Sequence, residues 1–223
     1  MSKKEQSIRV DVFDNNPEGY HGFQSFFLSQ LEEVSQLYRR FFESLDLNNG
    51  HKIIEVGIGT GLNIEYYPSG AELHGIDISA NMLELARKKL ATLNREAEIK
   101  VGDAYDIQYP DNYFDRVAGI FVVGVADYPQ KMLSEMSRIC KPGGQIGIID
   151  YHKSQQLNTV IDQQFFGETM SQGIFFAGKP VLACNALHDL DEYVRDMDLD
   201  LVFDERIDKS FSQSFRATIF RKK

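Results

Sequence analysis

Residues 52–61 read Lys-Ile-Ile-Glu-Val-Gly-Ile-Gly-Thr-Gly, an apolar run followed by three glycines at alternate positions. The apolar half is typical of a strand buried in a parallel sheet, and the glycines predict a sharp turn into a short helix. Because glycine has no Cβ, such a turn leaves room for a ligand against the main chain. A tight turn that binds no ligand would use the same glycines, so other motifs must show whether this loop binds a ligand.

Beyond this loop, short apolar runs alternate with helical stretches, which predicts a doubly wound, mostly parallel α/β sheet. Ser79 is the expected N-cap of a helix at 79–93. Two late runs predict an antiparallel edge hairpin, turned near 208–210. The seven expected strands lie at 52–56, 72–76, about 99–101, 114–123, 145–149, 199–205 and 215–220.

The segments that flank this core predict a cap and a lid. Apolar residues recur every three or four positions from Phe23 to Leu45, which predicts one long helix after a polar, irregular start. Aromatic residues and glycines in the segment after the fifth strand predict a substrate lid with hinges, and a further helix is expected at 187–197. The length of 223 residues suits one domain. It comprises an N-terminal helical cap (1–50), a core (51–150), a lid (151–187) and a helix with the C-terminal hairpin (188–223).

Composition excludes several classes of function. With 24 basic against 33 acidic residues, the net charge of -9 disfavours a broad nucleic-acid-binding face. Cys140 and Cys184 do not form a CxxC pair, and the histidines lack ligand spacing, so we expect neither a disulfide framework nor a metal site. The polar start and the lack of an apolar run of about 18 residues predict a cytoplasmic protein without stable membrane insertion.

Acidic residues follow the next two strands of the predicted sheet. Asp77 ends the second strand, where a carboxylate can accept hydrogen bonds from both hydroxyls of a ribose. Asp103, between Gly102 and Ala104, ends the third strand, where it can read the amino edge of an adenine. Each acid could be an ordinary cap or loop residue. At the ends of successive strands, together with the glycine loop, they predict an adenosine-containing ligand.

The glycine spacing bears on which ligand this is. A dinucleotide fingerprint, GxGxxG, would place its third glycine at position 62 and offer a helix N-terminus to pyrophosphate. Leu62 holds that place, and Gly61 comes one residue early. The spacing favours a cofactor without phosphates and disfavours a nicotinamide-dependent oxidoreductase.

The successive motifs EVGIGTGLN, GIDIS with NMLELARKK, GDAYDI, FDRVAGIFVV and RICKPGGQIGIID, within residues 52–150, resemble the class I methyltransferase family. The resemblance implies the sheet order 3-2-1-4-5-7-6 with the last strand antiparallel, and S-adenosyl-L-methionine as the cofactor. It also implies cofactor-contacting residues. Glu55 supports the loop and Asp77 meets the ribose. The amino acid portion is lined by Gly57, Gly59 and Gly61. The adenine is flanked by Ile78 and Met82, and its amino group meets Asp103 and Ala104. Ile120 is a further cofactor-binding residue.

The acceptor is a small molecule on this reading. The fourth strand lacks the Asn/Asp-Pro-Pro-Tyr/Phe signature of enzymes that methylate amino groups of bases or glutamine, since 121–124 reads Phe-Val-Val-Gly. The stretch GTGLNIEYYP is similar to bacterial phospholipid N-methyltransferases, which leaves a phospholipid headgroup as an alternative acceptor. A non-catalytic protein that binds S-adenosylmethionine is a third possibility, because a cofactor fold alone does not prove turnover. The acceptor atom and the oligomeric state stay open.

Methyl transfer is an in-line displacement at a sulfonium carbon, so positioning in a dry pocket supplies much of the acceleration. A general base is needed only where the nucleophile holds its proton tightly. His152, shortly after the fifth strand, is the first candidate, since imidazole titrates near neutral pH. Tyr20, where a flap could close over the cofactor, and Tyr128, after the fourth strand, are the others. Each of the three is more often a packing or surface residue.

Overall fold

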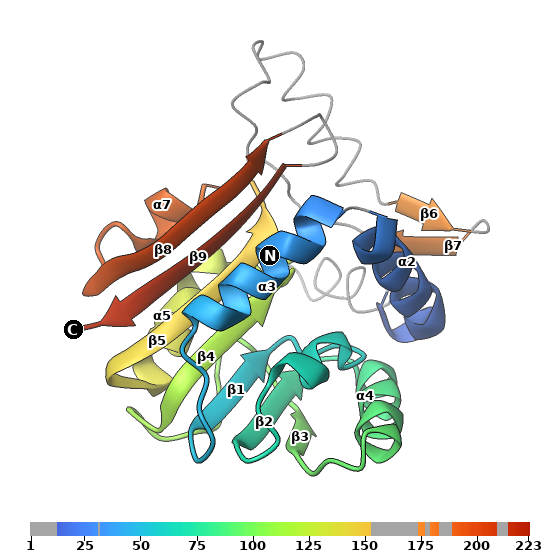
Figure 1. The fold of residues 1–223 in the computed structure, drawn as a ribbon, viewed down its shortest axis with the longest axis horizontal. Helices are drawn as coiled ribbons and strands as arrows, with labels where there is room; N and C mark the ends of the chain where they lie inside the picture. The colour runs from blue at the N-terminus through green and yellow to red at the C-terminus, as the bar shows by residue number, and fades with distance from the viewer. Residues whose placement is uncertain (1–12, 31, 153–173, 177–178, 183–188, 209–213) are drawn as a thin grey trace.

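A seven-stranded sheet runs through the centre of the molecule, in a computed structural model that describes residues 13–30, 32–152, 174–176, 179–182, 189–208 and 214–223 (Figure 1). The order β3-β2-β1-β4-β5-β9-β8 confirms the predicted 3-2-1-4-5-7-6. Neighbours from β3 to β5 pair in parallel, and β9 is antiparallel to both β5 and β8. The strands are β1 (Lys52–Val56), β2 (Glu72–Asp77), β3 (Glu98–Val101), β4 (Phe114–Ile120), β5 (Cys140–Tyr151), β8 (Leu199–Asp208) and β9 (Ser214–Lys222).

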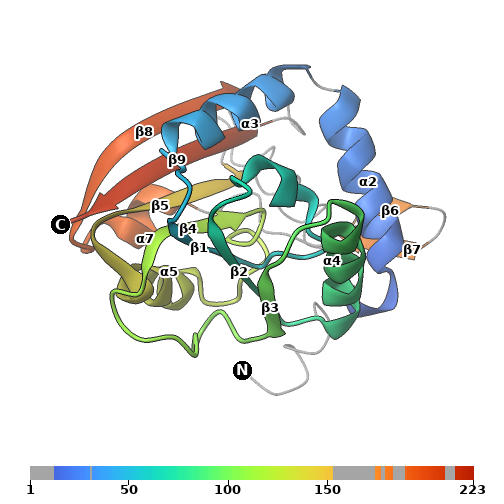
Figure 2. The same cartoon turned by 60° about the horizontal axis from the view of Figure 1, so that its bottom comes forward.

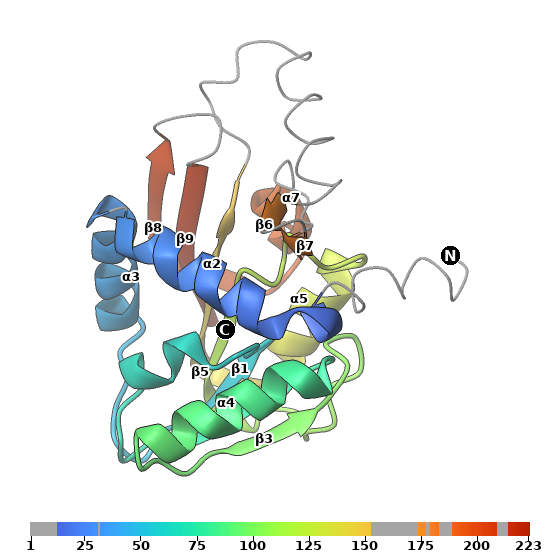
Figure 3. The same ribbon diagram turned by 90° about the vertical axis from the view of Figure 1, so that its right-hand side faces the viewer.

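Helices cover both faces of this sheet, as Figure 3 shows from its edge. One face carries α2 (Pro17–Gln30), α3 (Glu32–Ser44), the 3-10 helix η1 (Leu62–Tyr66) and α4 (Ala80–Thr92); the other carries α5 (Pro129–Ile139) and α7 (Leu190–Val194). Each face has its own hydrophobic cluster. Since successive side chains of a strand point to opposite faces, Ile53 packs with the α3 side and Ile54 with the α5 side. Both are fully buried, which explains the unbroken apolar run at 52–56.

The expectation of one long N-terminal helix was wrong. Two helices are present, and α2 begins at Pro17, inside the stretch predicted to be irregular. Proline lacks the N–H that the first turn of a helix leaves unpaired, so it suits a helix start. Figure 2 shows α2 crossing above α4 rather than continuing the line of α3.

Other element boundaries also differ from those expected. β5 begins at Cys140 rather than at the expected residue 145, and so includes the Lys-Pro-Gly-Gly stretch, with a register shift against β4. The expected helix at 187–197 is described only as the single turn α7. A short antiparallel hairpin of β6 (Ile174–Phe176) and β7 (Lys179–Leu182) lies within the segment predicted as a lid, where no strands were expected. Most of the predicted lid, 153–173, and the turn at 209–213 lie outside the described residues.

Close packing of α3 on the sheet requires a glycine at one position of β5. A Cβ on Gly147 would stand 2.6 Å from Cζ of Phe41 and 3.0 Å from Cδ1 of Leu45. Both of these side chains are fully buried. The absence of a side chain at position 147 therefore lets α3 lie against the strand.

We expect Gly147→Ala to lower the free energy of unfolding by about 1–3 kcal/mol, because the added methyl overpacks the α3 interface. Combining it with Phe41→Leu should lower the free energy of unfolding by less than the sum of the two single changes, because leucine leaves room for the added methyl group. Denaturant unfolding of the three variants measures this. Gly22→Ala, with nothing within 4 Å of the added Cβ, is the matched control. Additive effects would show that the contact does not limit packing.

Candidate functional site

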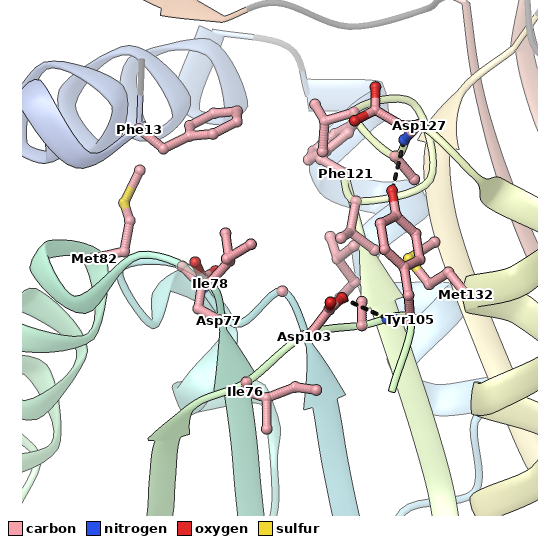
Figure 4. Close-up of a pocket in the computed structure, with 18 of the residues that line it drawn as sticks. Phe13, Ile76, Asp77, Ile78, Met82, Asp103, Tyr105, Phe121, Asp127 and Met132 are labelled. Carbon is pink, nitrogen blue, oxygen red and sulfur yellow. Dashed lines mark hydrogen bonds between the residues drawn. The ribbon is translucent and has the colours of Figure 1, made fainter. Parts of the chain in front are cut away.

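The carboxyl ends of four strands meet at one edge of the sheet and border a cavity (Figure 4). Register places Val56 beside Ile76 and Gly119, and Asp77 beside Val101, so the segments that follow these strands converge. About 920 Å³ of empty space lies within the cavity, a volume that includes open solvent. Expected site residues that line it are Tyr20, Gly57, Gly59, Asp77, Ile78, Met82, Asp103, Ala104 and Ile120.

The glycine loop binds back to the neighbouring strand through its backbone. The N–H groups of Gly57 and Ile58 donate to the carbonyl of Ile76, at 2.8 and 3.0 Å. Gly57 has a φ of 74° and a Cβ there would lie 2.5 Å from the Val122 side chain. Glycine is thus required both for the backbone angle and for the close approach.

Gly61 does not border the cavity, so its expected place along a ligand is not supported. A Cβ on Gly61 would lie 2.5 Å from Cδ1 of Ile64 and 3.2 Å from Ala86. With a φ of 77°, it forms the N-cap of η1. Its absent side chain lets η1 approach α4, which is a packing role.

The Asp77 carboxyl joins the ends of the first two strands. Its Oδ2 accepts from the Gly59 N–H at 2.8 Å and its Oδ1 from the Ser79 N–H at 2.9 Å. Burial raises the pKa of Asp77, and these backbone donors oppose the rise. Ser79 caps α4 as predicted, accepting from the Met82 N–H. A carboxylate has about four lone-pair sites, so Asp77 can accept further bonds from a ligand.

Glu55 lies behind the loop, in a smaller side cavity. Its carboxyl accepts from Asn63 Nδ2 at 2.7 Å and from the Tyr67 hydroxyl at 2.8 Å. Burial raises the pKa of Glu55 to about 7, although the two hydrogen bonds lower it. These bonds connect the first strand to η1, in agreement with the expected supporting role. The side cavity is lined by Tyr20, Tyr38, Glu55, Gly57, Ile58, Gly59, Thr60, Leu62, Asn63, Ile120 and Phe121.

Phe121 separates the two cavities and was missed by the sequence reading. It has a φ of 55°, in the left-handed region, which costs a bulky residue about 1–3 kcal/mol. Its N–H donates to the Ile149 carbonyl at 2.7 Å, and its ring lies 5.4 Å from that of Tyr151 and 6.3 Å from that of Tyr38. No sequence signal announces a positive φ at a phenylalanine.

The segment after Phe121 forms one wall of the main cavity. Asp150 Oδ2 accepts from the Gly124 N–H at 2.9 Å, and the Tyr105 hydroxyl accepts from the Asp127 N–H at 2.6 Å. Asp103 Oδ1 in turn accepts from the Tyr105 N–H at 2.8 Å. Asp127 and Tyr105 therefore both belong to the cavity wall.

The charged side chains that line the two cavities are acidic. Asp77, Asp103 and Asp127 line the main cavity and Glu55 lines the side cavity. No lysine, arginine or histidine is among the described residues that line either cavity. A site of this kind favours cations and hydrogen-bond donors and disfavours phosphates.

The N-terminal helical segment covers the loop through polar contacts. His21 Nδ1 lies 2.8 Å from Thr60 Oγ1, and Asp14 Oδ1 accepts from Ser79 Oγ at 2.7 Å. Burial, together with the charge of Lys89, lowers the pKa of His21. Tyr20 lines both cavities, where the flap was expected.

Two candidate catalytic residues do not reach the cavities. His152 is buried beyond the end of β5, and it lines neither cavity. Tyr128 is 46% exposed and packs edge-on against Tyr105, with ring centroids 5.6 Å apart. Sequence position alone could not show which way these side chains point.

Within the described ranges, no three or more His, Cys, Asp or Glu residues are grouped to hold a metal ion. The helices described in the same ranges are all too short or too polar to cross a membrane.

Residues 54–148 match the family model of a methyltransferase domain. The chain is 38% identical over 121 residues to a phosphatidylethanolamine N-methyltransferase of Cereibacter sphaeroides, which covers 53% of this chain and 60% of that protein. It is 31% identical over 158 residues to a demethylmenaquinone methyltransferase of Symbiobacterium thermophilum, and this match covers 68% of this chain and 61% of that protein. The chain thus spans about three fifths of these relatives' length.

Solved structures share the fold at low identity. An S-adenosylmethionine-dependent methyltransferase of Aquifex aeolicus has a TM-score of 0.59 at 18% identity, over 82% of this chain and 87% of that one. The [4+2]-cyclase SpnF has a TM-score of 0.65 at 16% identity, over 85% and 80%. Likeness at this level concerns the fold alone.

We expect Glu55 to make stability fall as pH rises. Its pKa lies near 7 in the folded chain against an ordinary 4.5, so its contribution is full below about pH 4.5 and is lost as pH rises through about 7. The loss is on the order of 3 kcal/mol. Denaturant unfolding at about pH 5 and about pH 8 should show this drop in the wild type and not in Glu55→Gln, which stays neutral. Parallel profiles of the two proteins would contradict it.

Proposed function

We propose, from the premise that residues 54–148 form a class I methyltransferase domain, that this chain transfers a methyl group from S-adenosylmethionine to a small-molecule acceptor. One observation carries the proposal. The cavity at the strand ends has carboxylates at Asp77 and Asp103 and no cationic side chain among its described lining residues. Such a site suits a sulfonium cofactor without phosphates.

The residues present fit this cofactor. The Asp77 carboxylate, already fixed by two N–H groups, has capacity left for the hydroxyls of a ribose. Ile78 and Met82 provide apolar surface for an adenine, and Asp103 with Ala104 offers acceptors to its amino group. Gly57 and Gly59, with Ile120 opposite, leave the main chain open to the amino acid portion.

Catalysis by these residues is mainly positioning. S-adenosylmethionine supplies an electrophilic methyl group when bound. Tyr20 and Phe121 line both cavities. Aromatic side chains beside a reacting centre reduce its contact with water, which strengthens electrostatic interactions there. Neither His152 nor Tyr128 is assigned a proton transfer, because neither lines either of the two cavities described above.

A phospholipid headgroup acceptor is a second candidate, favoured by the 38% identity to a phosphatidylethanolamine N-methyltransferase. A third, a non-methylating protein, is favoured by the fold shared with the cyclase SpnF. Transfer of a labelled methyl group to extracted lipids or to water-soluble acceptors separates the first two, and lack of any transfer supports the third.

We expect S-adenosylhomocysteine to bind the wild type and Asp77→Asn to weaken it by about tenfold or more, because a charge-assisted bond is worth about 1.5–3 kcal/mol. Calorimetry measures the affinity, and Asp106→Asn, an exposed residue outside the cavity, is the control for net charge. An unfolding curve confirms that Asp77→Asn is folded. Equal affinities, or tighter binding of NAD than of S-adenosylhomocysteine, would contradict the proposed placement.

A further inference from the structure

We propose that Tyr105 is a positioning residue whose hydroxyl links the adenosine side of the cavity to the wall left for the acceptor. Through this link, the wall becomes ordered when the cofactor binds. The inference rests on the proposed function and concerns how its two binding regions act together. It starts from the wall segment, which is residues 121–128 after β4, and from the loop that follows β3.

The first half of the wall segment is held by the end of β5. The Phe121 N–H donates to the Ile149 carbonyl at 2.7 Å, and the Gly124 N–H donates to Asp150 Oδ2 at 2.9 Å. Because β5 pairs with β4, these bonds fix the start of the wall segment to the sheet itself. The four residues that make them are not among those assigned to the cofactor.

The second half of the wall segment is held by Tyr105. Its hydroxyl oxygen accepts from the Asp127 N–H at 2.6 Å and from the Tyr128 N–H at 3.2 Å. A hydroxyl oxygen can accept more than one hydrogen bond, so one side chain serves both donors. Figure 4 shows the Tyr105 ring extending from the loop after β3 to the backbone of Asp127. Two adjacent amides of the wall segment are thus bound by a side chain of another loop.

Tyr105 follows directly after the two residues assigned to the adenine amino group. Its own N–H donates to Asp103 Oδ1 at 2.8 Å, and the Gly102 N–H donates to the Asp77 carbonyl at 3.0 Å. Hydrogen bonds therefore connect the end of β2 to Tyr105. Coupling between neighbouring sites is carried by contiguous networks of this kind. A ligand held by Asp103 and Ala104 restricts the loop, and the Tyr105 ring transmits this restriction to the wall segment.

The wall segment borders the part of the cavity that the proposed cofactor contacts leave. Phe121, Val122, Val125 and Ala126 line the cavity, and all four stand outside the set assigned to the cofactor. Residues 121–128 lie between β4 and α5, outside any helix or strand. Segments of this kind open locally more easily than the elements of a core. Anchoring by Tyr105 therefore determines how well this side of the cavity is ordered.

Hydrogen exchange at single amides, followed by NMR, tests the coupling. In the ligand-free wild type, the Asp127 and Tyr128 amides should exchange at least about tenfold faster than the Ile54 amide of β1, because they open locally. Calorimetry then shows the concentration of S-adenosylhomocysteine that saturates the protein. We expect saturation to slow exchange of the two wall amides by about tenfold or more.

Tyr105→Phe removes the hydroxyl and keeps the ring, which packs edge-on against Tyr128. Both wall amides should exchange about tenfold faster in this variant, because they lose their acceptor. Saturation with S-adenosylhomocysteine should then change their rates by less than about twofold. The matched control is Tyr109→Phe, since the Tyr109 hydroxyl donates to Glu98 at 3.1 Å and lies outside both cavities. It should behave like the wild type.

The outcomes separate coupling from a structural role alone. Equal slowing by S-adenosylhomocysteine in the wild type and in Tyr105→Phe would show that the ligand orders the wall by direct contact, and would overturn the inference. So would a wild type in which the ligand does not slow the wall amides, or in which they exchange as slowly as Ile54. These wild-type results do not depend on the folding of any variant, and an unfolding curve checks Tyr105→Phe. Calorimetry that detects no S-adenosylhomocysteine binding to the wild type would instead refute the proposed function.

Discussion

The Asp77 carboxyl is the interaction on which the site depends. It receives the N–H of Gly59 and the N–H of Ser79, and so joins the loop after β1 to the start of α4. Parallel register brings these two strand ends together, and a short acidic side chain is what can reach both donors at once. Without it, two part-buried backbone N–H groups would lose their acceptor. The shape of the cavity floor therefore follows from one residue and from the sheet beneath it.

A second buried acid, Glu55, lies close enough to Asp77 for their negative charges to repel. Glu55 carries a raised pKa because it is buried, and the charge of Asp77 raises it further. The chain keeps both groups without a basic partner among the described residues that line the cavities. Such an arrangement costs stability in the ligand-free state and is relieved by a cation. The same electrostatics suit a sulfonium cofactor that carries no phosphates.

The sequence predicted what local chemistry determines. The apolar runs and glycines predicted an alternating, mostly parallel α/β sheet, and the family resemblance implied its strand order. Ser79 was correctly expected to cap α4, and Gly57 and Asp77 line the cavity at the strand ends. It failed where tertiary contacts decide. Two helices replace the expected single one, since periodicity does not show where a helix changes direction. Gly61 shares the spacing of the other glycines, yet its absent side chain serves helix packing. The orientations of His152 and Tyr128 depend on neighbours that no spacing reveals.

Specificity here must come from parts that vary around a shared core. The same fold occurs in the [4+2]-cyclase SpnF, so the fold alone does not determine the reaction. Phe13 and Tyr20 lie outside the matched segment 54–148 and still line the cavity, because His21 and Asp14 fasten their helical segment to Thr60 and Ser79. Phe121 and Asp127 follow β4 and line the same cavity, and Phe121 has a left-handed backbone conformation there. The cavity is thus bordered by two segments, one before and one within the matched domain, that meet beside the glycine loop.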